Sequence, residues 1–404
     1  MHDKYKASLD WLFFQFPAFQ TQGASAYKPG LETTFQLLEA VGNPQEKLKF
    51  IHVAGTNGKG STCSYIASLL TEKGFKTGLF TSPHIFDFRE RIRINGEKIK
   101  ETDVIDFCDW VKILPLTTAP SFFEITFVMA MVHFAKEKCD YVVLETGLGG
   151  RLDATNTVLP VLSIITRIGI DHQQFLGETL PEIAVEKAGI IKKNVPILIG
   201  QRQTEIENVF SEKANTEQAP LYFAEDEKTT LQIPPHLPYY HQANLKTALV
   251  AMQLLDIEIT EETLNKALEN LHRNTGLFGR LQRIQEKPTI WLDASHNEDG
   301  IKATLHALPK IEGQLYILYG ASNDKNCEEI FQLFPKDALL NLCTFSNPRS
   351  KKKVELEALQ KENQQIEAVF EDVNKAIVFI RKQMNENDAL WVTGSFFLLS
   401  DIVL

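Results

Sequence analysis

Short runs of apolar residues alternate along the chain with longer stretches whose apolar residues recur at helical spacing. In the first part, the runs predict buried strands at Lys49–Ala54, Thr77–Phe80, Tyr141–Glu145, Val161–Arg167 and Val195–Ile199. Helical patterns lie between them, at Ser61–Lys73 and Ser121–Lys138. Continuously apolar strands separated by helices are typical of a parallel sheet that helices cover on both faces. An α/β domain is therefore predicted.

This alternation is interrupted once and then starts again. Prolines in residues 220–240 predict an irregular or edge connection, and helices follow at Asn244–Leu255 and Glu261–His272. After a turn-rich segment, Arg273–Gly279, strands are predicted at Thr289–Leu292, Leu315–Tyr319, Leu340–Phe345 and Ala389–Val392. We place a domain boundary near residue 275, which gives a first domain of residues 1–275 and a smaller Rossmann-like α/β domain of residues 276–404.

The charge composition argues against nucleic acid as a partner. The chain has 404 residues and a net charge of −10, from 42 Lys and Arg against 52 Asp and Glu. Such an acidic chain is a poor candidate for general nucleic-acid binding, because that needs a basic face to displace counterions. Small anionic ligands stay possible, since a few local donors can hold them.

The cysteines and the N-terminus indicate a cytoplasmic protein. Five cysteines lie far apart without a CxxC pair, which is typical of a reduced chain. The apolar stretch Trp11–Phe16 is stopped by Pro17, and it is too short for a signal-peptide core or a membrane span. We expect no membrane partner.

The strongest chemical signal is Gly55-Thr56-Asn57-Gly58-Lys59-Gly60-Ser61, between a predicted strand and a predicted helix. Glycines at such a junction let backbone N–H groups close around phosphates, and the helix N-terminus favours an anion. Lys59 would bring a positive charge to the outer phosphates. The segment departs from the standard P-loop pattern at Val53, where that pattern has its first glycine, and at Gly60, where it has Ser or Thr. An incidental glycine turn is the simpler alternative, but strand, turn, lysine and helix follow in the order that the mechanism needs.

Three further polar side chains lie at or just after the ends of predicted strands, namely Ser82, Glu145 and His172. The carboxyl ends of neighbouring parallel strands meet at one edge of a sheet, so these side chains should converge near the phosphate loop. A hydroxyl, a carboxylate and an imidazole there could hold Mg²⁺ against nucleotide phosphates. Taken singly, each has a simpler role, as a turn cap, a partner of Arg151 or a buried histidine.

A second glycine-rich loop, Gly147–Asn156, follows Glu145 directly. Its glycines would allow close approach of a ligand, and Arg151 offers a fork for a carboxylate or phosphate. Lys187 is expected late on a helix, where its role is open, because a cation would repel Mg²⁺. In the second domain, Asp293-Ala294-Ser295-His296-Asn297 follows a strand, and an acid there with Arg280 could clasp a nucleotide.

In order and spacing, these motifs resemble those of the folylpolyglutamate synthases and bifunctional dihydrofolate synthases of the Mur ligase superfamily. The resemblance extends from the first helix to Thr393-Gly394-Ser395 and rests on Gly55–Ser61, Thr81–His84, Glu145–Asn156, Ile170–His172, Glu186–Ile190 and Asp293–Asn297. It implies an N-terminal P-loop ATPase domain of Mur-ligase type and a smaller C-terminal Rossmann-like domain. It also implies a magnesium-dependent ligase that uses ATP to add L-glutamate to dihydropteroate or to tetrahydrofolate, through an acyl phosphate.

The resemblance further implies roles for single residues. Ser82, Glu145 and His172 are similar to magnesium ligands, and Lys59, His172 and Lys187 to catalytic residues. Lys187 resembles a lysine that CO₂ converts to a carbamate, an anion able to help organise a second Mg²⁺. The implied ATP-binding set is Thr56, Asn57, Gly58, Lys59, Gly60, Ser61, Asn244, Arg280, Asp293 and His296. The implied substrate contacts are Tyr27, Lys28, Pro29, Ser121, Phe122, Phe123, Glu124, Leu152, Asp153 and Ala154, with Arg151 beside them.

The chain departs from the family pattern at three places. Phe278 stands where many relatives have Pro, Phe396-Phe397 where they often have Leu-Tyr, and Phe122 where some bifunctional members have Tyr. The last departure touches pterin binding, so the sequence leaves open whether one or both activities are present. Tail length and the preferred folate form also stay open. Relatives are typically monomeric, which predicts a monomer.

Two other functions fit the sequence less well. A ligase for peptidoglycan precursors would carry a separate domain for the UDP group, whereas only about fifty residues precede the phosphate loop. Gly60 also separates the folate enzymes from those ligases, which usually have Thr or Ser there. A catalytically inactive nucleotide-binding protein would be expected to lack Lys59, Glu145 or His172, and all three are present.

Overall fold

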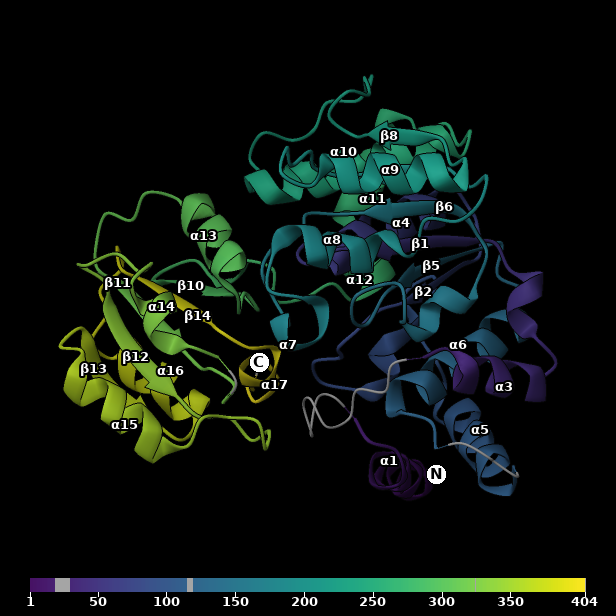
Figure 1. Cartoon of the computed structure of the whole chain (residues 1–404). Coiled ribbons are helices and arrows are strands. Elements are labelled where there is room, and N and C mark those ends of the chain that lie inside the picture. The colour runs from purple at the N-terminus through teal and green to yellow at the C-terminus, as the bar shows by residue number, and fades with distance from the viewer. Residues whose placement is uncertain (19–29, 115–118, 324, 404) are drawn as a thin grey trace. The chain divides into compact units, whose positions relative to one another are not determined.

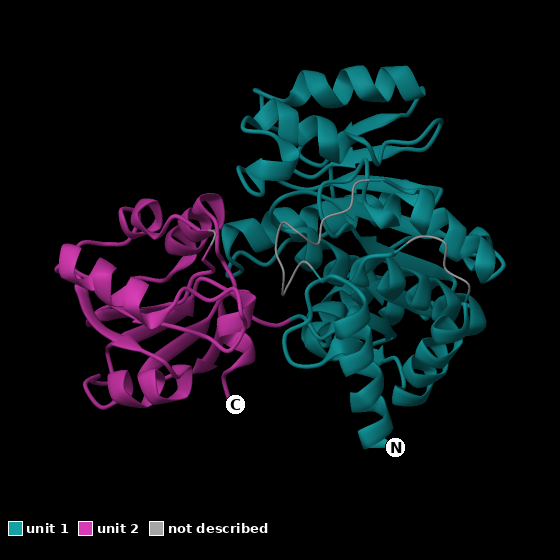
Figure 2. Cartoon of the chain, turned by 60° about the horizontal axis from the view of Figure 1, so that its bottom comes forward, with its two compact units in different colours: residues 1–277 teal, residues 278–404 magenta. Residues whose placement is uncertain are grey.

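The computed structural model describes residues 1–18, 30–114, 119–323 and 325–403 (Figure 1). It consists of two compact units, Met1–Leu277 and Phe278–Leu404, each with its own sheet (Figure 2). Both units have the α/β architecture with mostly parallel sheets that the alternation predicted. The division falls within the turn-rich segment of residues 273–279.

The first unit is built on an eight-stranded sheet in the order β4-β3-β2-β5-β1-β6-β7-β8. Its strands are β1 (Phe50–Ala54), β2 (Thr77–Phe80), β3 (Ile92–Ile94), β4 (Glu97–Lys98), β5 (Tyr141–Glu145), β6 (Pro160–Ile165), β7 (Ile197–Ile199) and β8 (Leu221–Phe223). Six neighbouring strands, β2, β5, β1, β6, β7 and β8, run parallel. The hairpin of β3 and β4 adds an antiparallel edge. Because β1 pairs with both β5 and β6, the glycine loop that follows β1 begins in the middle of the sheet.

Helices cover both faces of this sheet, and the side chains of β1 pack against helices on each face. Ile51 and Val53 lie in the core beneath α4 (Lys59–Glu72), α10 (Tyr239–Leu254) and α11 (Glu261–Glu269). Phe50 belongs to the core on the other face, with residues of α6 (Phe122–Lys136). All five β1 residues are buried and all but His52 are apolar, as expected for a parallel strand between two helical layers.

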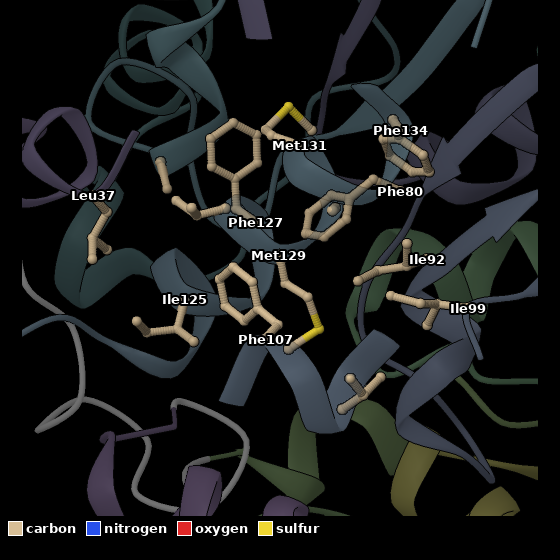
Figure 3. Close-up of a cluster of buried hydrophobic side chains, with 14 of the residues drawn as sticks. Leu37, Phe80, Ile92, Ile99, Phe107, Ile125, Phe127, Met129, Met131 and Phe134 are labelled. Atoms are coloured by element: carbon tan, nitrogen blue, oxygen red, sulfur yellow. The ribbon is translucent and has the colours of Figure 1, made fainter. Parts of the chain in front are cut away.

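Figure 3 shows a buried core in which aromatic and aliphatic side chains of α6 pack with side chains from other elements of the unit. Phe127 and Phe134 are fully buried, and the ring of Phe80 contacts that of Phe127 edge-on, with centroids 6.0 Å apart. A Cβ on Gly78 would lie 2.9 Å from the Phe134 ring, so glycine at this point of β2 lets α6 lie close to the sheet. The remaining helices of the unit are α1 (His2–Gln15), α3 (Glu32–Ala40), α5 (Glu101–Ile113), α7 (Gln173–Leu176), α8 (Leu180–Ala188), α9 (Glu207–Glu217) and α12 (Leu271–Thr275), with 3₁₀ turns at Pro44–Lys47, Phe88–Arg91 and Ala154–Thr157.

The second unit contains a six-stranded sheet in the order β13-β12-β11-β14-β10-β9, in which only β9 is antiparallel to its neighbour. Its core includes Trp391 and Tyr319, both fully buried. The strands are β9 (Gln282–Gln285), β10 (Thr289–Leu292), β11 (Leu315–Tyr319), β12 (Leu339–Cys343), β13 (Ile366–Phe370) and β14 (Ala389–Thr393). The helices are α13 (Glu298–Ala307), α14 (Cys327–Phe331), α15 (Lys353–Glu362), α16 (Val373–Arg381) and α17 (Phe396–Ser400).

The structure differs from the predicted elements at a few places. The short edge strand β8 lies in the stretch predicted to be irregular or an edge connection. The helix expected over Glu261–His272 is interrupted at Asn270, which separates α11 from α12. In the part of the chain that the structure describes, none of the helices is both long enough and apolar enough to cross a bilayer.

Candidate active site

The phosphate loop is held between β6 and α10 by contacts that only glycine permits. A Cβ on Gly55, whose φ is +148°, would lie 1.9 Å from Thr166 Oγ1. A Cβ on Gly58, whose φ is +89°, would lie 2.5 Å from Asn244 Oδ1. Thr166 Oγ1 also donates to the carbonyl oxygen of Asn57 at 2.8 Å. The structure thus brings Asn244 of the implied ATP-binding set directly against this loop.

Two lysines meet at one carbonyl oxygen of the loop. Lys59 Nζ donates to the carbonyl oxygens of Gly55 and Thr56, at 3.1 and 3.2 Å. Lys187 Nζ, from the end of α8, donates to the same Gly55 oxygen at 2.9 Å. Lys187 is buried, and burial together with the nearby charge of Lys59 lowers its pKa from 10.5 to about 7. Near neutral pH, a substantial share of Lys187 is therefore the uncharged amine.

Glu145 lies between the start of α4 and the residues that follow β2. Its side chain is buried, and Oε2 accepts a hydrogen bond from the backbone N–H of Ser82 at 2.9 Å. A Cβ on Gly60 would lie 3.6 Å from Glu145 Oε1. This is an ordinary van der Waals distance, so Gly60 lies beside the carboxylate of Glu145.

His172 occupies the third predicted position, after β6. It has a left-handed backbone, with φ of 52°, and caps the short helix α7. The backbone N–H of His172 donates to Asp171 Oδ1 at 2.9 Å. The negative charge of Asp171 in turn favours the protonated form of Lys187. Within the described residues, no group of three or more His, Cys, Asp and Glu side chains could hold a metal ion by itself. The oxygens of Glu145 and Ser82 are donors that suit Mg²⁺, which commonly takes few protein ligands and completes its shell with nucleotide phosphates.

The second glycine-rich loop is organised around Asp153. This buried carboxylate accepts hydrogen bonds from the N–H groups of Gly147, Leu148 and Thr155, at 2.9, 2.8 and 3.0 Å. Thr155 Oγ1 also donates to Asp153, and it lies 2.8 Å from Nε2 of the buried His52 on β1. Burial raises the pKa of Asp153. The side chain expected to contact substrate is thus occupied in holding its own loop.

Replacing Thr155 with valine should destabilise the first unit. The change keeps the volume but removes the hydroxyl between His52 and Asp153, so two buried polar groups lose a partner, at a cost of about 2 kcal/mol of unfolding free energy. Thr157→Val is the matched control, since the Thr157 hydroxyl donates only to the carbonyl oxygen of Ala154. Urea denaturation measures both variants. Equal midpoints for the two would show that the chain from His52 to Asp153 is energetically unimportant.

The same loop packs against the end of α8 through glycine on each side. A Cβ on Gly189 would lie 2.4 Å from Arg151 Cα, and one on Gly150 would lie 2.9 Å from the carbonyl oxygen of Glu186. The N–H of Arg151 donates to that Glu186 oxygen at 2.8 Å. These backbone contacts join the loop to the segment that carries Lys187 and so fix the backbone position of that lysine.

Arg151 pairs with Glu186, a partner that the sequence did not suggest. The guanidinium donates to Glu186 Oε1 through Nη2 at 2.8 Å and through Nε at 3.2 Å, and its side chain is about half exposed. The alternative that Glu145 is a partner of Arg151 stays a prediction. A substrate carboxylate at Arg151 would share the guanidinium with Glu186.

The segment Ser121–Glu124 divides its roles between helix capping and the core. Ser121 and Glu124 form a capping box at the start of α6, and Glu124 also accepts from Thr34 Oγ1 at 2.9 Å. The buried ring of Phe122 stacks on Phe13 of α1, with centroids 4.5 Å apart. The ring of Phe123 lies against Gly147, where a Cβ would come within 2.6 Å of it. Phe123 is thus the member of this segment that borders the second glycine loop.

The other implied substrate contacts are placed as follows. Ala154 is buried in the same core as α6, and Leu152 is half-buried. Tyr27, Lys28 and Pro29 lie outside the described residues, so their predicted contacts stay predictions.

Sequence reasoning missed a buried cation at this edge of the sheet. Arg91 precedes β3, and its Nε donates to Nδ1 of His84 at 2.7 Å. Its guanidinium lies 5.4 Å from the centre of the Phe122 ring, and the charge of Glu145 acts on it favourably. Burial lowers the pKa of Arg91 to about 10, so it stays charged at neutral pH. The sequence could not place Arg91 here, because β3, the strand that follows it and pairs with β2, has three residues and is too short to be predicted.

In the second unit, the implied nucleotide-binding residues form one cluster. Asp293 is buried at the end of β10 and accepts from the N–H groups of Leu281 and Ser295, at 2.6 and 2.8 Å. The charge of Arg280 acts on this carboxylate, although burial, the larger effect, raises the pKa of Asp293. His296 Nδ1 donates to the carbonyl oxygen of Ala294 at 2.9 Å, which leaves Nε2 without a proton in the neutral ring.

Comparison with known proteins shows which protein family this chain resembles. Residues 53–259 match the Mur ligase middle domain, and residues 279–396 match the Mur ligase glutamate ligase domain. The chain is 34% identical to the dihydrofolate synthase/folylpolyglutamate synthase of Bacillus subtilis, over 93% of this chain and 94% of that protein.

Solved structures show the same likeness. Folylpolyglutamate synthase from Thermotoga maritima is 30% identical, with a TM-score of 0.80 over 99% of this chain and 96% of its own. A bifunctional folylpolyglutamate synthase/dihydrofolate synthase with Mn, AMPPNP and L-glutamate bound is 26% identical, with a TM-score of 0.83 over 97% of this chain and 96% of its own.

Proposed function

Because this chain belongs to the Mur ligase family, and within it to the folylpolyglutamate and dihydrofolate synthases, we propose that it activates the carboxylate of a pteroate or folate with ATP and joins L-glutamate to it. The chain is an ATP-dependent ligase of glutamate. The relatives named above are enzymes of folate metabolism, which favours this substrate class over peptidoglycan precursors. The observation that carries the proposal is the phosphate loop with Lys59, Lys187 and Glu145 gathered around it.

The reaction has two steps. A carboxylate oxygen of the pteroate or folate attacks the γ-phosphorus of ATP, and ADP leaves. The amine of glutamate then attacks the carbonyl carbon of the acyl phosphate, loses a proton, and forms the amide as inorganic phosphate departs with the electrons of the C–O bond. Phosphoryl transfer depends mainly on positioning and on charge stabilisation, which the N–H groups of Gly55–Ser61 and the ammonium of Lys59 supply.

Ser82, Glu145 and His172 are the residues proposed to hold Mg²⁺. The buried carboxylate of Glu145 beside Gly60 supports this assignment, because it places a negative charge next to the phosphate loop. When bound, Mg²⁺ neutralises the charge of the β- and γ-phosphates. A second Mg²⁺ near His172 is part of the same proposal.

Lys187 is proposed to carry a carbamate. Its uncharged amine would attack CO₂, forming an N–C bond and releasing one proton, and the product is an anion. Two facts support this: Lys187 is buried beside Lys59, and its lowered pKa gives the neutral amine that the reaction needs. The negative carbamate would relieve the repulsion between two ammonium groups at Gly55.

For the nucleotide, we propose Asn244 beside the phosphate loop and the cluster of Arg280, Asp293 and His296 in the second unit. For the pteroate or folate, we propose Phe123 and the loop around Ala154, with Arg151 at its exposed side. The other contacts of this proposal are Thr56, Asn57, Gly58, Gly60, Ser61, Tyr27, Lys28, Pro29, Ser121, Phe122, Glu124, Leu152 and Asp153.

Whether the chain acts on dihydropteroate, on tetrahydrofolate or on both is tested by ADP release. The assay contains ATP, Mg²⁺ and L-glutamate, with each acceptor in a separate tube and a third tube without acceptor. We propose both activities, so both acceptor tubes should release ADP above the third. Release with a single acceptor would limit the enzyme to one activity, and release with neither would refute the proposed function.

Glu145→Gln should raise the concentration of Mg²⁺ needed for half-maximal rate by about ten- to a hundredfold, because the amide keeps the shape but lacks the charge that attracts the ion. Glu137→Gln is the control, since Glu137 forms an exposed ion pair with Lys76 at the far end of α6. Initial rates over a Mg²⁺ titration measure both. An unchanged Mg²⁺ requirement in Glu145→Gln would show that Glu145 is not a ligand.

A further inference from the structure

Within the second unit, two of the proposed nucleotide-binding side chains contact one aromatic ring. The guanidinium carbon of Arg280 lies 4.8 Å from the centre of the Phe396 ring. The ring of His296 contacts the same ring, with centroids 6.1 Å apart and planes at 54°. Phe396 itself has no group that could bind a phosphate, so a role toward the phosphates would have to act through its neighbours.

The position of Phe396 is fixed by the backbone that leads into α17. The N–H of Gly394 and the hydroxyl of Thr393 both donate to the carbonyl oxygen of Ser295, at 3.0 and 3.1 Å. A Cβ on Gly394, whose φ is +108°, would lie 2.4 Å from the carbonyl oxygen of Gly320. The end of β14 is therefore tied to the segment of His296, and the first residue of α17 follows directly from it.

Arg280 is oriented from two directions. The carboxylate of Asp293 attracts it by charge, while both oxygens of that carboxylate already accept backbone N–H groups from Leu281 and Ser295. The negative face of an aromatic ring attracts a guanidinium and suits its planar shape. An aliphatic side chain offers neither the charge distribution nor the flat surface.

We propose that Phe396 is a positioning residue for nucleotide binding, whose ring holds the Arg280 guanidinium in its binding orientation and borders His296. This rests on the proposed function, because the nucleotide is the ligand that Arg280 is assigned to bind. The neighbouring Phe397 packs on Phe345 instead, with centroids 6.0 Å apart, and provides a matched control on the same helix.

Four variants of the full-length protein test the proposal, namely Phe396→Leu, Phe396→Tyr, Phe397→Leu and Arg280→Ala, together with the double variant of Phe396→Leu and Arg280→Ala. The dissociation constant of ATP with Mg²⁺ is measured by titration calorimetry, and KM for ATP and for the folate acceptor in the ADP-release assay. Far-UV circular dichroism and urea midpoints show whether each variant is folded.

Phe396→Leu should weaken ATP binding and raise KM for ATP by about three- to tenfold, with KM for the acceptor unchanged. Phe396→Tyr should stay within about twofold of wild type, because it keeps the aromatic face. In the Arg280→Ala background, Phe396→Leu should add no further loss, because the ring acts through that guanidinium.

An unchanged ATP affinity in Phe396→Leu, an equal loss in Phe397→Leu, or a full additional loss in the double variant would each overturn the proposal. Wild-type protein that binds no ATP would instead refute the proposed function, so the two failures are told apart in the same experiment.

Discussion

Replacing Lys59 with alanine is expected to lower kcat/KM for ATP-dependent amide formation by a factor of about a thousand. The ammonium of Lys59 lies at the start of α4 with its Nζ on two carbonyl oxygens of the phosphate loop, 3.1 and 3.2 Å away. In the proposed function, a rotation of the side chain would bring this charge to the β- and γ-phosphates. Alanine removes the charge where it develops during phosphoryl transfer, and water supplies no equivalent.

Lys73→Ala is the matched control for this prediction. Lys73 caps the opposite end of the same helix and is exposed, so its loss should leave kcat/KM within about twofold of wild type. ADP formation is followed under saturating glutamate and acceptor. Turnover of Lys59→Ala near the level of Lys73→Ala would refute the assignment of the phosphate loop.

Lys187→Ala should lower kcat by about a hundredfold, and short carboxylic acids in the buffer should restore part of the activity. The substitution would leave a space beside Gly55 where a small carboxylate could replace the proposed carbamate. Lys187→Arg should stay inactive, because a guanidinium does not form a carbamate. Full activity of Lys187→Arg, or no response of Lys187→Ala to formate or acetate, would contradict the carbamate.

The pKa of Lys187 gives this prediction a pH dependence. Below pH 7 the amine is mostly protonated and does not react with CO₂, and above pH 7 the neutral amine dominates. After removal of CO₂, activity should therefore return faster on addition of bicarbonate at pH 8 than at pH 6. Lys192→Ala is the control, since Lys192 is also partly buried but donates to the carbonyl oxygen of Asn156.

The longer parallel strands could be predicted from the sequence because a strand that is buried on both faces is an almost continuous run of apolar residues. β2, β5 and β10 have the predicted bounds, and β1 begins one residue later than expected. β4 and β8 have two and three residues, which is too few for any period to be recognised. The helix break at Asn270 could not be read either, since the apolar positions continue across it.

Some contacts of the candidate site could also be predicted from the sequence, whereas others could not. The rule for strand ends placed Ser82 and Glu145 together, because Ser82 follows β2, Glu145 ends β5, and these two strands are neighbours in the sheet. The approach of Lys187 to Gly55 depends on Gly150 and Gly189, which let two backbones come close, and no pattern of side chains records such a contact. The pairing of Arg151 with Glu186 is a product of that same packing.

The most direct test of the whole account follows the oxygen atoms of the acceptor carboxylate. Dihydropteroate or tetrahydrofolate labelled with heavy oxygen in the reacting carboxylate is incubated with the enzyme, ATP, Mg²⁺ and L-glutamate, and the released phosphate is analysed by mass spectrometry. Activation as an acyl phosphate predicts one labelled oxygen in each phosphate, in step with amide product. Amide formation with unlabelled phosphate would contradict it.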